Sequence, residues 1–191
     1  MALTKPAAGQ WRYEDLFSLP DDGRRYEIIE GALYEMPAPS WDHVAIVMNL
    51  VLMLGPMVQS LGGRLATAPA DVFFEGANPV QPDIMAMLPG GGAIGHGRGI
   101  EGVPDLLIEV LSPSNRGHDV LTKRALYARA GVGEYWIFDP MNQTVEMLTL
   151  DRDALHTAQN AAGDDDAISP LRGDIAFPLA RIFAGTDARE Y

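Results

Sequence analysis

The sequence predicts an α/β domain of the mixed (α+β) kind, in which one β-sheet is flanked by helices. The run from Asp105 to Ser112 is apolar on both faces of a strand, which is typical of a central strand covered on both sides. Helix-like segments precede and follow this run, so strands and helices mix along the chain. Hydrophobic residues make up 47% of the 191 residues and charged residues 21%, which favours one domain with a substantial core.

The N-terminal part predicts a β-hairpin. A short helix is expected from Tyr13 to Leu19. Two strand-like segments follow, at 26–29 and 32–36, and they flank the pair Glu30-Gly31. Such a pair suits a tight turn between antiparallel strands.

A long helix is expected after the hairpin. Ser40 or Asp42 is placed to cap its first turn, and Gly62-Gly63 ends it after about Leu61. Because the segment is apolar on nearly every side, we expect it to lie deep against the sheet. Its longest apolar stretch, 44–58, is shorter than the ~20 residues that a membrane-spanning helix needs.

The next segments predict strands and a glycine-rich loop. Strands are expected at 64–68, 71–75 and 80–88, and the loop at 89–102. Residues 97–102 formally match G-x-G-x-x-G. A strand follows the match, whereas a dinucleotide site needs a helix there, so we reject that interpretation.

The second half of the chain predicts a turn, a helix and two strands, which lie in that order at 112–115, 119–130, 134–138 and 144–150. Gly131 is well placed to end the helix. The remaining residues predict an edge hairpin and a short helix near 179–183. We expect residues 1–12 to be a flexible tail, and 13–191 to be one domain with an acidic C-terminal extension from about 151.

Composition narrows the classes of function. The chain has no cysteine, which excludes a disulfide scaffold, a thiolate zinc site and a cysteine nucleophile. This absence and the lack of an apolar N-terminal segment lead us to expect a cytoplasmic protein without a membrane partner. The net charge of −12 counts against a general nucleic-acid binder, because such binding rests on basic contacts to phosphates. It counts less against an enzyme with a local groove.

Three charged residues lie in or beside hydrophobic segments. Asp83 follows Pro82 at the start of a strand, Glu109 lies among leucines, and Lys123 lies in the middle of a helix. A buried charge shifts its pKa or finds a partner, and two carboxylates on neighbouring strands can share a divalent cation. Ordinary alternatives remain open: a strand-start cap for Asp83, an arginine partner for Glu109, and a solvated ion pair with Asp119 for Lys123.

The motifs around these residues are, in chain order, YEIIEG at 26–31, VQPDI at 80–84, PDLLIEVLSPS at 104–114, the pair Lys123 and Tyr127, and GVGEYWIFDP at 131–140. Together they resemble the bacterial family described as a "putative restriction endonuclease" family, within the PD-(D/E)XK nuclease superfamily. The resemblance spans roughly residues 13–150, which is most of the chain.

This resemblance implies a restriction-endonuclease-like fold and a Mg²⁺-dependent endonuclease that hydrolyses DNA with metal-activated water. Asp83 and Glu109 would bind one or two Mg²⁺ ions, for which Mn²⁺ could substitute, and the Val110 backbone carbonyl would be a further ligand. The superfamily's lysine usually lies two residues after the glutamate, where this chain has Leu111. We assign its role to Lys123, which would hold the attacking water or neutralise charge on the phosphate.

Further site residues are assigned on the same basis. Glu27 would complete the metal site from the hairpin, although it is equally compatible with an exposed hairpin glutamate. His43 is either a base or an ordinary residue at the start of a helix. The residues expected to contact substrate are Gln81, His43, Arg24, Arg25 and Tyr127.

The leading expectation is a homodimeric DNA endonuclease with one cut per strand. One alternative is a nuclease-like fold that binds or scaffolds without cleavage, which the acidic charge and Leu111 both favour. Another is a metal-dependent hydrolase of small phosphorylated substrates, which suits a net charge of −12 better than long DNA does.

Overall fold

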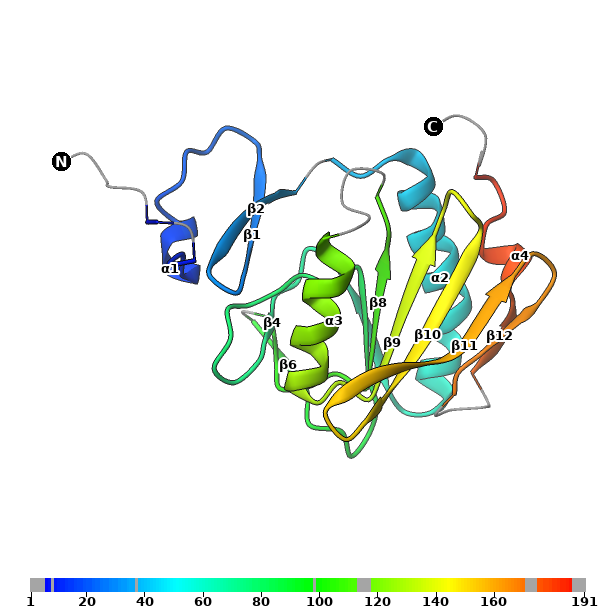
Figure 1. Ribbon diagram of the computed structural model, residues 1–191. Helices are drawn as coiled ribbons and strands as arrows, with labels where there is room; N and C mark the ends of the chain where they lie inside the picture. The colour runs from blue at the N-terminus through cyan, green and yellow to red at the C-terminus, as the bar shows by residue number, and fades with distance from the viewer. Residues whose placement is uncertain are drawn as a thin grey trace.

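A six-stranded mixed β-sheet forms the centre of the computed structural model (Figure 1). The structure describes residues 6–7, 9–36, 38–97, 99–112, 118–170 and 175–186, without the side chains of 118–120. The strand order is β11-β10-β9-β8-β5-β3, in which β8 and β9 are parallel and all other neighbours antiparallel. In chain order the strands are β3 (Arg64–Thr67), β5 (Ile84–Met87), β8 (Leu106–Val110), β9 (Glu134–Asp139), β10 (Thr144–Asp151) and β11 (Ala154–Ala162).

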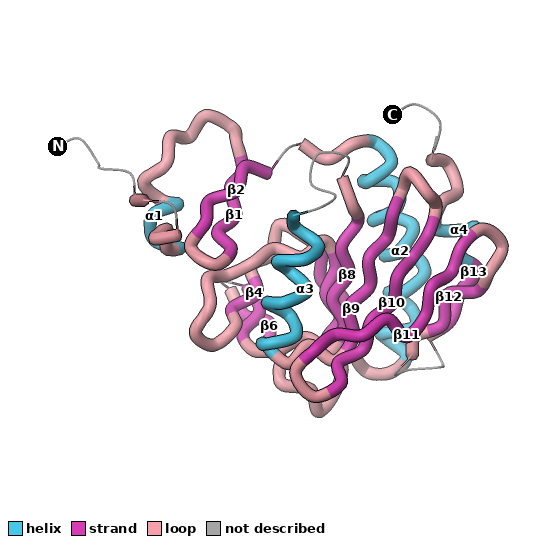
Figure 2. The backbone as a smooth tube through the Cα atoms, viewed as in Figure 1, coloured by secondary structure: helices cyan, strands magenta, loops and turns pink. Residues whose placement is uncertain are grey.

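Two helices cover opposite faces of this sheet (Figures 1 and 2). Helix α2 (Trp41–Ser60) buries one side against alternate residues of the strands, including Ile108 and Trp136. Helix α3 (His118–Ala130) packs on the other face, against Leu107 among others. Because strand side chains alternate between faces, the central strand β8 is covered on both sides, as the sequence predicts.

Helix α2 is less deeply buried than its composition predicts. Ser40 caps it, with its hydroxyl oxygen accepting a hydrogen bond from the backbone N–H of His43. By length and composition the helix could cross a membrane, but this is weak evidence, because a core helix passes the same test. One side packs on the sheet, whereas a row of large apolar side chains remains exposed: Trp41, Val44, Met48 and Leu52. The helix thus lies against the sheet as expected, but it is not a deeply buried helix.

The predicted N-terminal hairpin is present. Strands β1 (Arg25–Ile29) and β2 (Ala32–Met36) pair antiparallel. Glu30 and Gly31 form the turn with positive φ angles of 54° and 74°, a conformation in which glycine is favoured. Helix α1 is confined to Tyr13–Leu16, shorter than expected.

A small three-stranded sheet, β4-β7-β6, forms where the sequence predicted a strand at 71–75 and a loop at 89–102. Strand β4 has only two residues, Val72–Phe73, and it pairs with β7 (Gly99–Glu101), which also pairs with β6 (Ile94–His96). The segment expected to be a loop thus holds two short strands. Val80 makes only an isolated bridge, to Val72, so β5 begins four residues later than expected. After the G-x-G-x-x-G match no helix begins before β8, in agreement with our rejection of a dinucleotide site.

The C-terminal segment joins the body of the molecule. Strand β11 is an edge of the central sheet. The hairpin β12 (Asp166–Ile168) and β13 (Ala176–Pro178) leads into α4 (Leu179–Ile182), which contacts α2. The turn expected after Ser112 lies outside the described residues.

The order of the central strands decides where the candidate acids lie. Strands β5 and β8 are antiparallel neighbours in the register Ile84↔Ile108. The start of β5 therefore lies beside the end of β8, which brings Asp83 next to Glu109 and Val110. The condition for a shared site, that the two strands be neighbours, is met.

Candidate functional site

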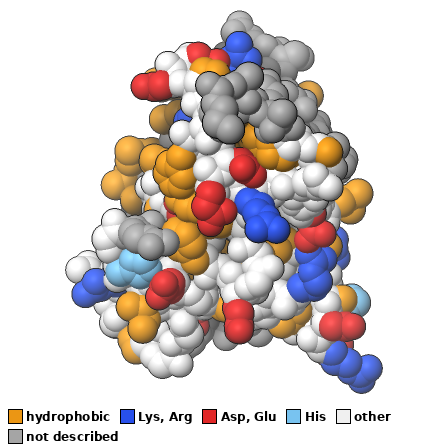
Figure 3. All heavy atoms as spheres, turned by 90° about the vertical axis from the view of Figure 1, so that its left-hand side faces the viewer, with side chains coloured by type: hydrophobic (Ala, Val, Ile, Leu, Met, Phe, Trp, Pro, Cys, Tyr) orange, Lys and Arg blue, Asp and Glu red, His pale blue; other side chains and the backbone are white. Residues whose placement is uncertain are grey.

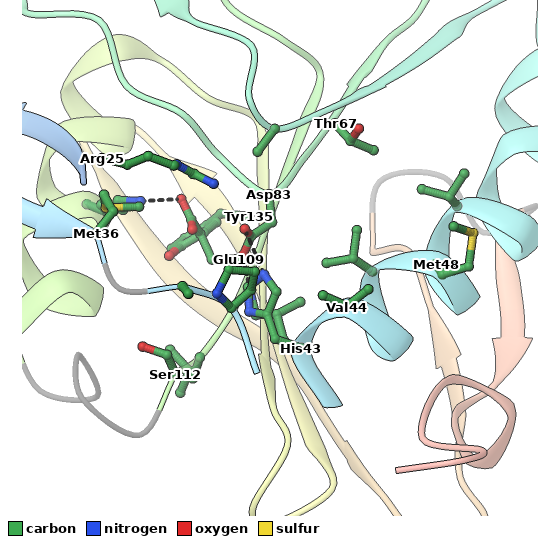
Figure 4. A pocket seen from close by; sticks show the side chains of 18 residues that line it. Arg25, Met36, His43, Val44, Met48, Thr67, Asp83, Glu109, Ser112 and Tyr135 are labelled. Carbon is green, nitrogen blue, oxygen red and sulfur yellow. Dashed lines mark hydrogen bonds and ion pairs between the residues drawn. The ribbon is translucent and has the colours of Figure 1, made fainter. Parts of the chain in front are cut away.

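A pocket of about 360 Å³ opens at this end of the sheet, between the β1–β2 hairpin, the start of α2, and α3 (Figure 4). Its walls combine two kinds of side chain. The start of α2 contributes an apolar side, which includes Val44 and Met48. The charged and polar groups on the walls are Arg25, His43, Thr67, Asp83, Glu109, Ser112, Lys123 and Tyr135.

A buried lysine joins two glutamates beside the pocket. Lys123 Nζ lies 2.9 Å from Glu109 Oε1 and 3.3 Å from Glu27 Oε2. Lys123 and Glu27 are each 4% exposed. The Tyr127 hydroxyl also donates to Glu109 Oε1, at 2.7 Å. Within the described residues, both hydrogen bonds to Glu109 end on Oε1, which leaves Oε2 for a further partner.

Burial dominates the electrostatics of this cluster. It raises the pKa of Glu109 to about 7, because removal from water penalises the carboxylate and Lys123 offsets this only in part; the charges of Asp83 and Glu27 raise it further. Burial alone would lower the pKa of Lys123, but the carboxylates of Glu109 and Glu27 outweigh it and hold that pKa well above the usual value. The lysine is therefore a fixed cation between the glutamates.

Both carboxylate oxygens of Asp83 have partners at the place where the start of β5 meets the end of β8. Its Oδ2 accepts a hydrogen bond from the backbone N–H of Val110 at 2.8 Å, and its Oδ1 lies 3.2 Å from His43 Nε2. Burial tends to lower the pKa of His43, but the hydrogen bond and charge of Asp83, with Glu109 and the backbone of Val110, raise it overall. His43 thus pairs with the aspartate that is predicted to hold a metal ion.

Glu27 is positioned by a chain of hydrogen bonds that reaches away from the pocket. Its Oε1 accepts from the backbone N–H of Gln81 at 2.9 Å. The Gln81 side chain donates to Asp71 at 2.9 Å, and Asp71 also accepts from the Tyr13 hydroxyl at 2.6 Å. Glu27 is accordingly a buried, oriented carboxylate, not the exposed hairpin residue that the sequence left open.

The residues expected to contact substrate are only partly brought together. Arg25 and His43 line the pocket. Arg24 is exposed, pairs with Asp22 and Glu35, and does not line it. Tyr127 does not line the pocket, and its hydroxyl donates to Glu109. Gln81 directs its side chain to Asp71, outside this pocket.

Two features of the site escaped sequence reasoning. Tyr135 on β9 lines the pocket, although its sequence allowed either the core or a dimer contact. In the structure it lies on the same face of β9 as Ile137, which pairs with Glu109, and the sequence carried no signal that chose this face. The link from Gln81 to Asp71 and Tyr13 joins segments distant in the chain and carried no sequence signal.

The donor set suits a hard divalent cation in its chemistry. Asp83 and Glu109 offer carboxylate oxygens, Val110 offers a backbone carbonyl, and the chain has no thiolate to favour a softer metal. Among the described residues, no group of three His, Asp or Glu side chains is arranged to hold a metal ion as it stands. Mg²⁺ commonly uses one or two carboxylates and completes its coordination with waters and phosphate oxygens, so two carboxylates are sufficient.

The fold and the site together define a restriction-endonuclease-like domain. The chain belongs to the Uma2 family, described as "Putative restriction endonuclease", whose family model matches residues 13–179.

A solved structure from Anabaena variabilis ATCC 29413, described as "a putative nuclease belonging to DUF820", is similar with a TM-score of 0.71 and 22% sequence identity. The alignment covers 91% of this chain and 98% of that chain, and it supports the predicted fold. A search of curated proteins found no match.

Proposed function

We propose that the protein is a Mg²⁺-dependent endonuclease that hydrolyses DNA phosphodiester bonds with metal-activated water. The single observation that carries this proposal is the meeting of Asp83, Glu109 and Lys123 around one pocket, although they lie on three different elements. Membership of a family described as restriction endonucleases supports it.

In this proposal, Asp83, Glu109 and the Val110 carbonyl hold the metal, with Glu27 as a nearby carboxylate. When bound, Mg²⁺ lowers the pKa of a water molecule and stabilises charge on the phosphate. Lys123 fixes Glu109 through Oε1 and presents a permanent positive charge beside the reacting phosphate. Tyr127 holds the same carboxylate oxygen, which would leave Oε2 for the cation.

The substrate must approach a locally favourable surface on an acidic protein. On the face shown in Figure 3, basic side chains are few and are separated by acidic and apolar ones. Arg25 lines the pocket and is the best placed cation for a phosphate contact. We therefore propose DNA contacts restricted to the pocket and its rim, with a steep dependence on salt only if several phosphates are bound.

A homodimer would allow one cut in each strand of a duplex. The exposed apolar row on α2 supports an association, because it begins beside the pocket and shares Val44 and Met48 with its wall. The oligomeric state in solution, measured by light scattering with Met48→Glu as a disrupting variant, tests this part of the proposal.

The decisive test is cleavage of supercoiled plasmid DNA with Mg²⁺, Mn²⁺ or EDTA. We expect cleavage with either metal, none with EDTA, and loss of cleavage in Glu109→Gln. Cleavage by Glu109→Gln at the wild-type rate would overturn the assignment. A matched control is Glu146→Gln. Glu146 is a partly exposed carboxylate on β10 that pairs with Arg124 and does not line the pocket.

A binding or scaffold role without cleavage is the second candidate. It is favoured by the engagement of both Asp83 oxygens with His43 and the Val110 N–H. Melting temperatures distinguish the two roles, because a ligand that binds only the folded state raises the melting temperature by mass action. No shift with millimolar Mg²⁺ or Mn²⁺, together with no cleavage, would favour the scaffold.

A further inference from the structure

One buried hydroxyl at the pocket has no partner. Tyr135 is fully buried in β9, and its hydroxyl makes no hydrogen bond within the described part of the chain. Its ring packs edge-on against Tyr127, with ring centroids 5.0 Å apart. Buried polar groups in folded proteins nearly always have partners, so an unpaired hydroxyl here calls for a ligand.

The neighbouring Tyr127 shows that a buried tyrosine hydroxyl in this part of the core can make a hydrogen bond. Tyr127 is buried to the same extent, yet its hydroxyl reaches Glu109 Oε1 at 2.7 Å. Two adjacent phenols on the same side of the sheet therefore differ in one respect. One is satisfied by the protein, and the other lines the pocket without a partner.

The surroundings of Tyr135 identify what the missing partner must be. Burial, and then the charge of Glu109, raise the pKa of Tyr135 well above its usual value, while Lys123 acts in the opposite direction. The phenol therefore stays protonated and donates. Figure 4 shows the labelled side chains of Asp83, Glu109 and Tyr135 meeting at the same pocket. An oxygen acceptor that binds among these groups would supply the partner that the hydroxyl lacks.

We propose that Tyr135 is a catalytic residue that donates a hydrogen bond to a non-bridging oxygen of the phosphodiester held at Asp83 and Glu109. This proposal rests on the proposed function and adds to it a neutral donor, which complements the charge of Lys123. A fixed donor aimed at an oxygen that gains negative charge favours the transition state over the bound substrate. The substitution should therefore affect kcat more than KM.

The test compares the wild type with Tyr135→Phe, which removes only the oxygen. In single-turnover cleavage of a short DNA duplex with Mg²⁺, we expect a rate about a hundredfold lower, with KM and the affinity for Mg²⁺ little changed. The melting temperature should not fall, because the lost hydroxyl has no partner in the described protein. Tyr127→Phe is the contrast: it releases Glu109 and should change Mg²⁺ affinity and stability together.

A second measurement separates this inference from the proposed function. Inorganic phosphate is added with Mg²⁺, and the melting temperatures of wild type and Tyr135→Phe are compared. If the wild type cleaves DNA and Tyr135→Phe cleaves equally fast, the role of Tyr135 is refuted and the nuclease remains. If the wild type does not cleave, but phosphate stabilises it more than Tyr135→Phe, the nuclease is refuted and the oxyanion contact stands. If there is neither cleavage nor a difference with phosphate, both are refuted.

Discussion

Two of the three Pro-Asp pairs of this chain, those before β5 and β8, occupy equivalent places at opposite ends of the central sheet. Because β5 and β8 are antiparallel, Asp83 before β5 and Asp105 before β8 lie at opposite ends of the pair. Each accepts a hydrogen bond from a backbone N–H at the end of the other strand: Asp83 from Val110 at 2.8 Å and Asp105 from Leu88 at 2.7 Å. Both aspartates therefore act as ordinary strand-start residues that accept a backbone hydrogen bond.

What differs is the surroundings of each aspartate. Asp83 lies beside Glu109, with Lys123 and His43 on the helices around it. Asp105 lies against the glycine-rich turn, in close contact with Gly91. A motif of two residues thus reports local structure, and the elements packed around it decide whether chemistry is possible.

The buried glutamates at the two ends differ in the same way. Glu134, 3% exposed, accepts hydrogen bonds within the described residues from Trp136 Nε1 at 2.7 Å and Ser169 Oγ at 2.8 Å. Glu109 accepts from a buried cation, Lys123, and from the Tyr127 hydroxyl, beside the pocket. We infer that Glu134 stabilises the fold, whereas the cluster of charges around Lys123 at the pocket is arranged for a ligand.

The largest difference between the ends should appear in activity. Asp83→Asn keeps an oxygen for the Val110 N–H but loses the charge that a metal ion needs, so we expect at least about a thousandfold slower cleavage of plasmid DNA with Mg²⁺. Asp105→Asn keeps the equivalent bond to Leu88 and should cleave at close to the wild-type rate. Equal losses in both variants would mean that the two ends do not differ in function.

The second largest effect should be on stability, where substitutions at the two glutamate sites should cost different amounts of unfolding free energy. Lys123→Met leaves two buried carboxylates without their cation, and we expect about 3–5 kcal/mol less free energy of unfolding in urea. Glu134→Gln retains an acceptor for Trp136 and Ser169 and should cost about 1 kcal/mol. A loss below that of Glu134→Gln would show that Lys123 does not hold this cluster together.

Most of the arrangement at the Asp83 end was predictable because it lies in regular elements. The hydrophobic pattern predicted that Glu109 lies on a covered strand. The apolar side of the helix that contains Lys123 predicted that this helix packs on the sheet. The family motifs then linked them to Asp83. These features follow from local pattern and from neighbouring strands.

The rest depends on contacts between distant segments. Nothing in the hairpin sequence shows that Gln81 holds Glu27, since that bond joins residues 54 positions apart. The tyrosine pair was likewise ambiguous, because Tyr135 lies in a strand with buried side chains on both faces. The exposed row on α2 was missed because an all-apolar segment has no polar face to mark the solvent side.

Binding of Mg²⁺ should distinguish the ends by a smaller free energy. At a concentration tenfold above the dissociation constant, a ligand stabilises the folded state by about 1.4 kcal/mol. We expect this gain for the wild type and for Asp105→Asn, and no gain for Asp83→Asn, in thermal unfolding with and without Mg²⁺. A gain that persists in Asp83→Asn would place the metal elsewhere.

The smallest expected effect concerns His43, which contacts the Asp83 oxygen that a metal ion would use. His43→Ala frees Oδ1, so we expect Mg²⁺ to bind about threefold more tightly, because a charge-assisted hydrogen bond no longer competes for it. His96→Ala is the matched control, since His96 pairs with Glu101 at 3.7 Å outside the pocket, and its variant should bind Mg²⁺ as the wild type does. Titration calorimetry with Mg²⁺ measures both. Weaker binding by His43→Ala would instead make His43 a ligand, and the difference between Asp83 and Asp105 would then include a coordinating imidazole.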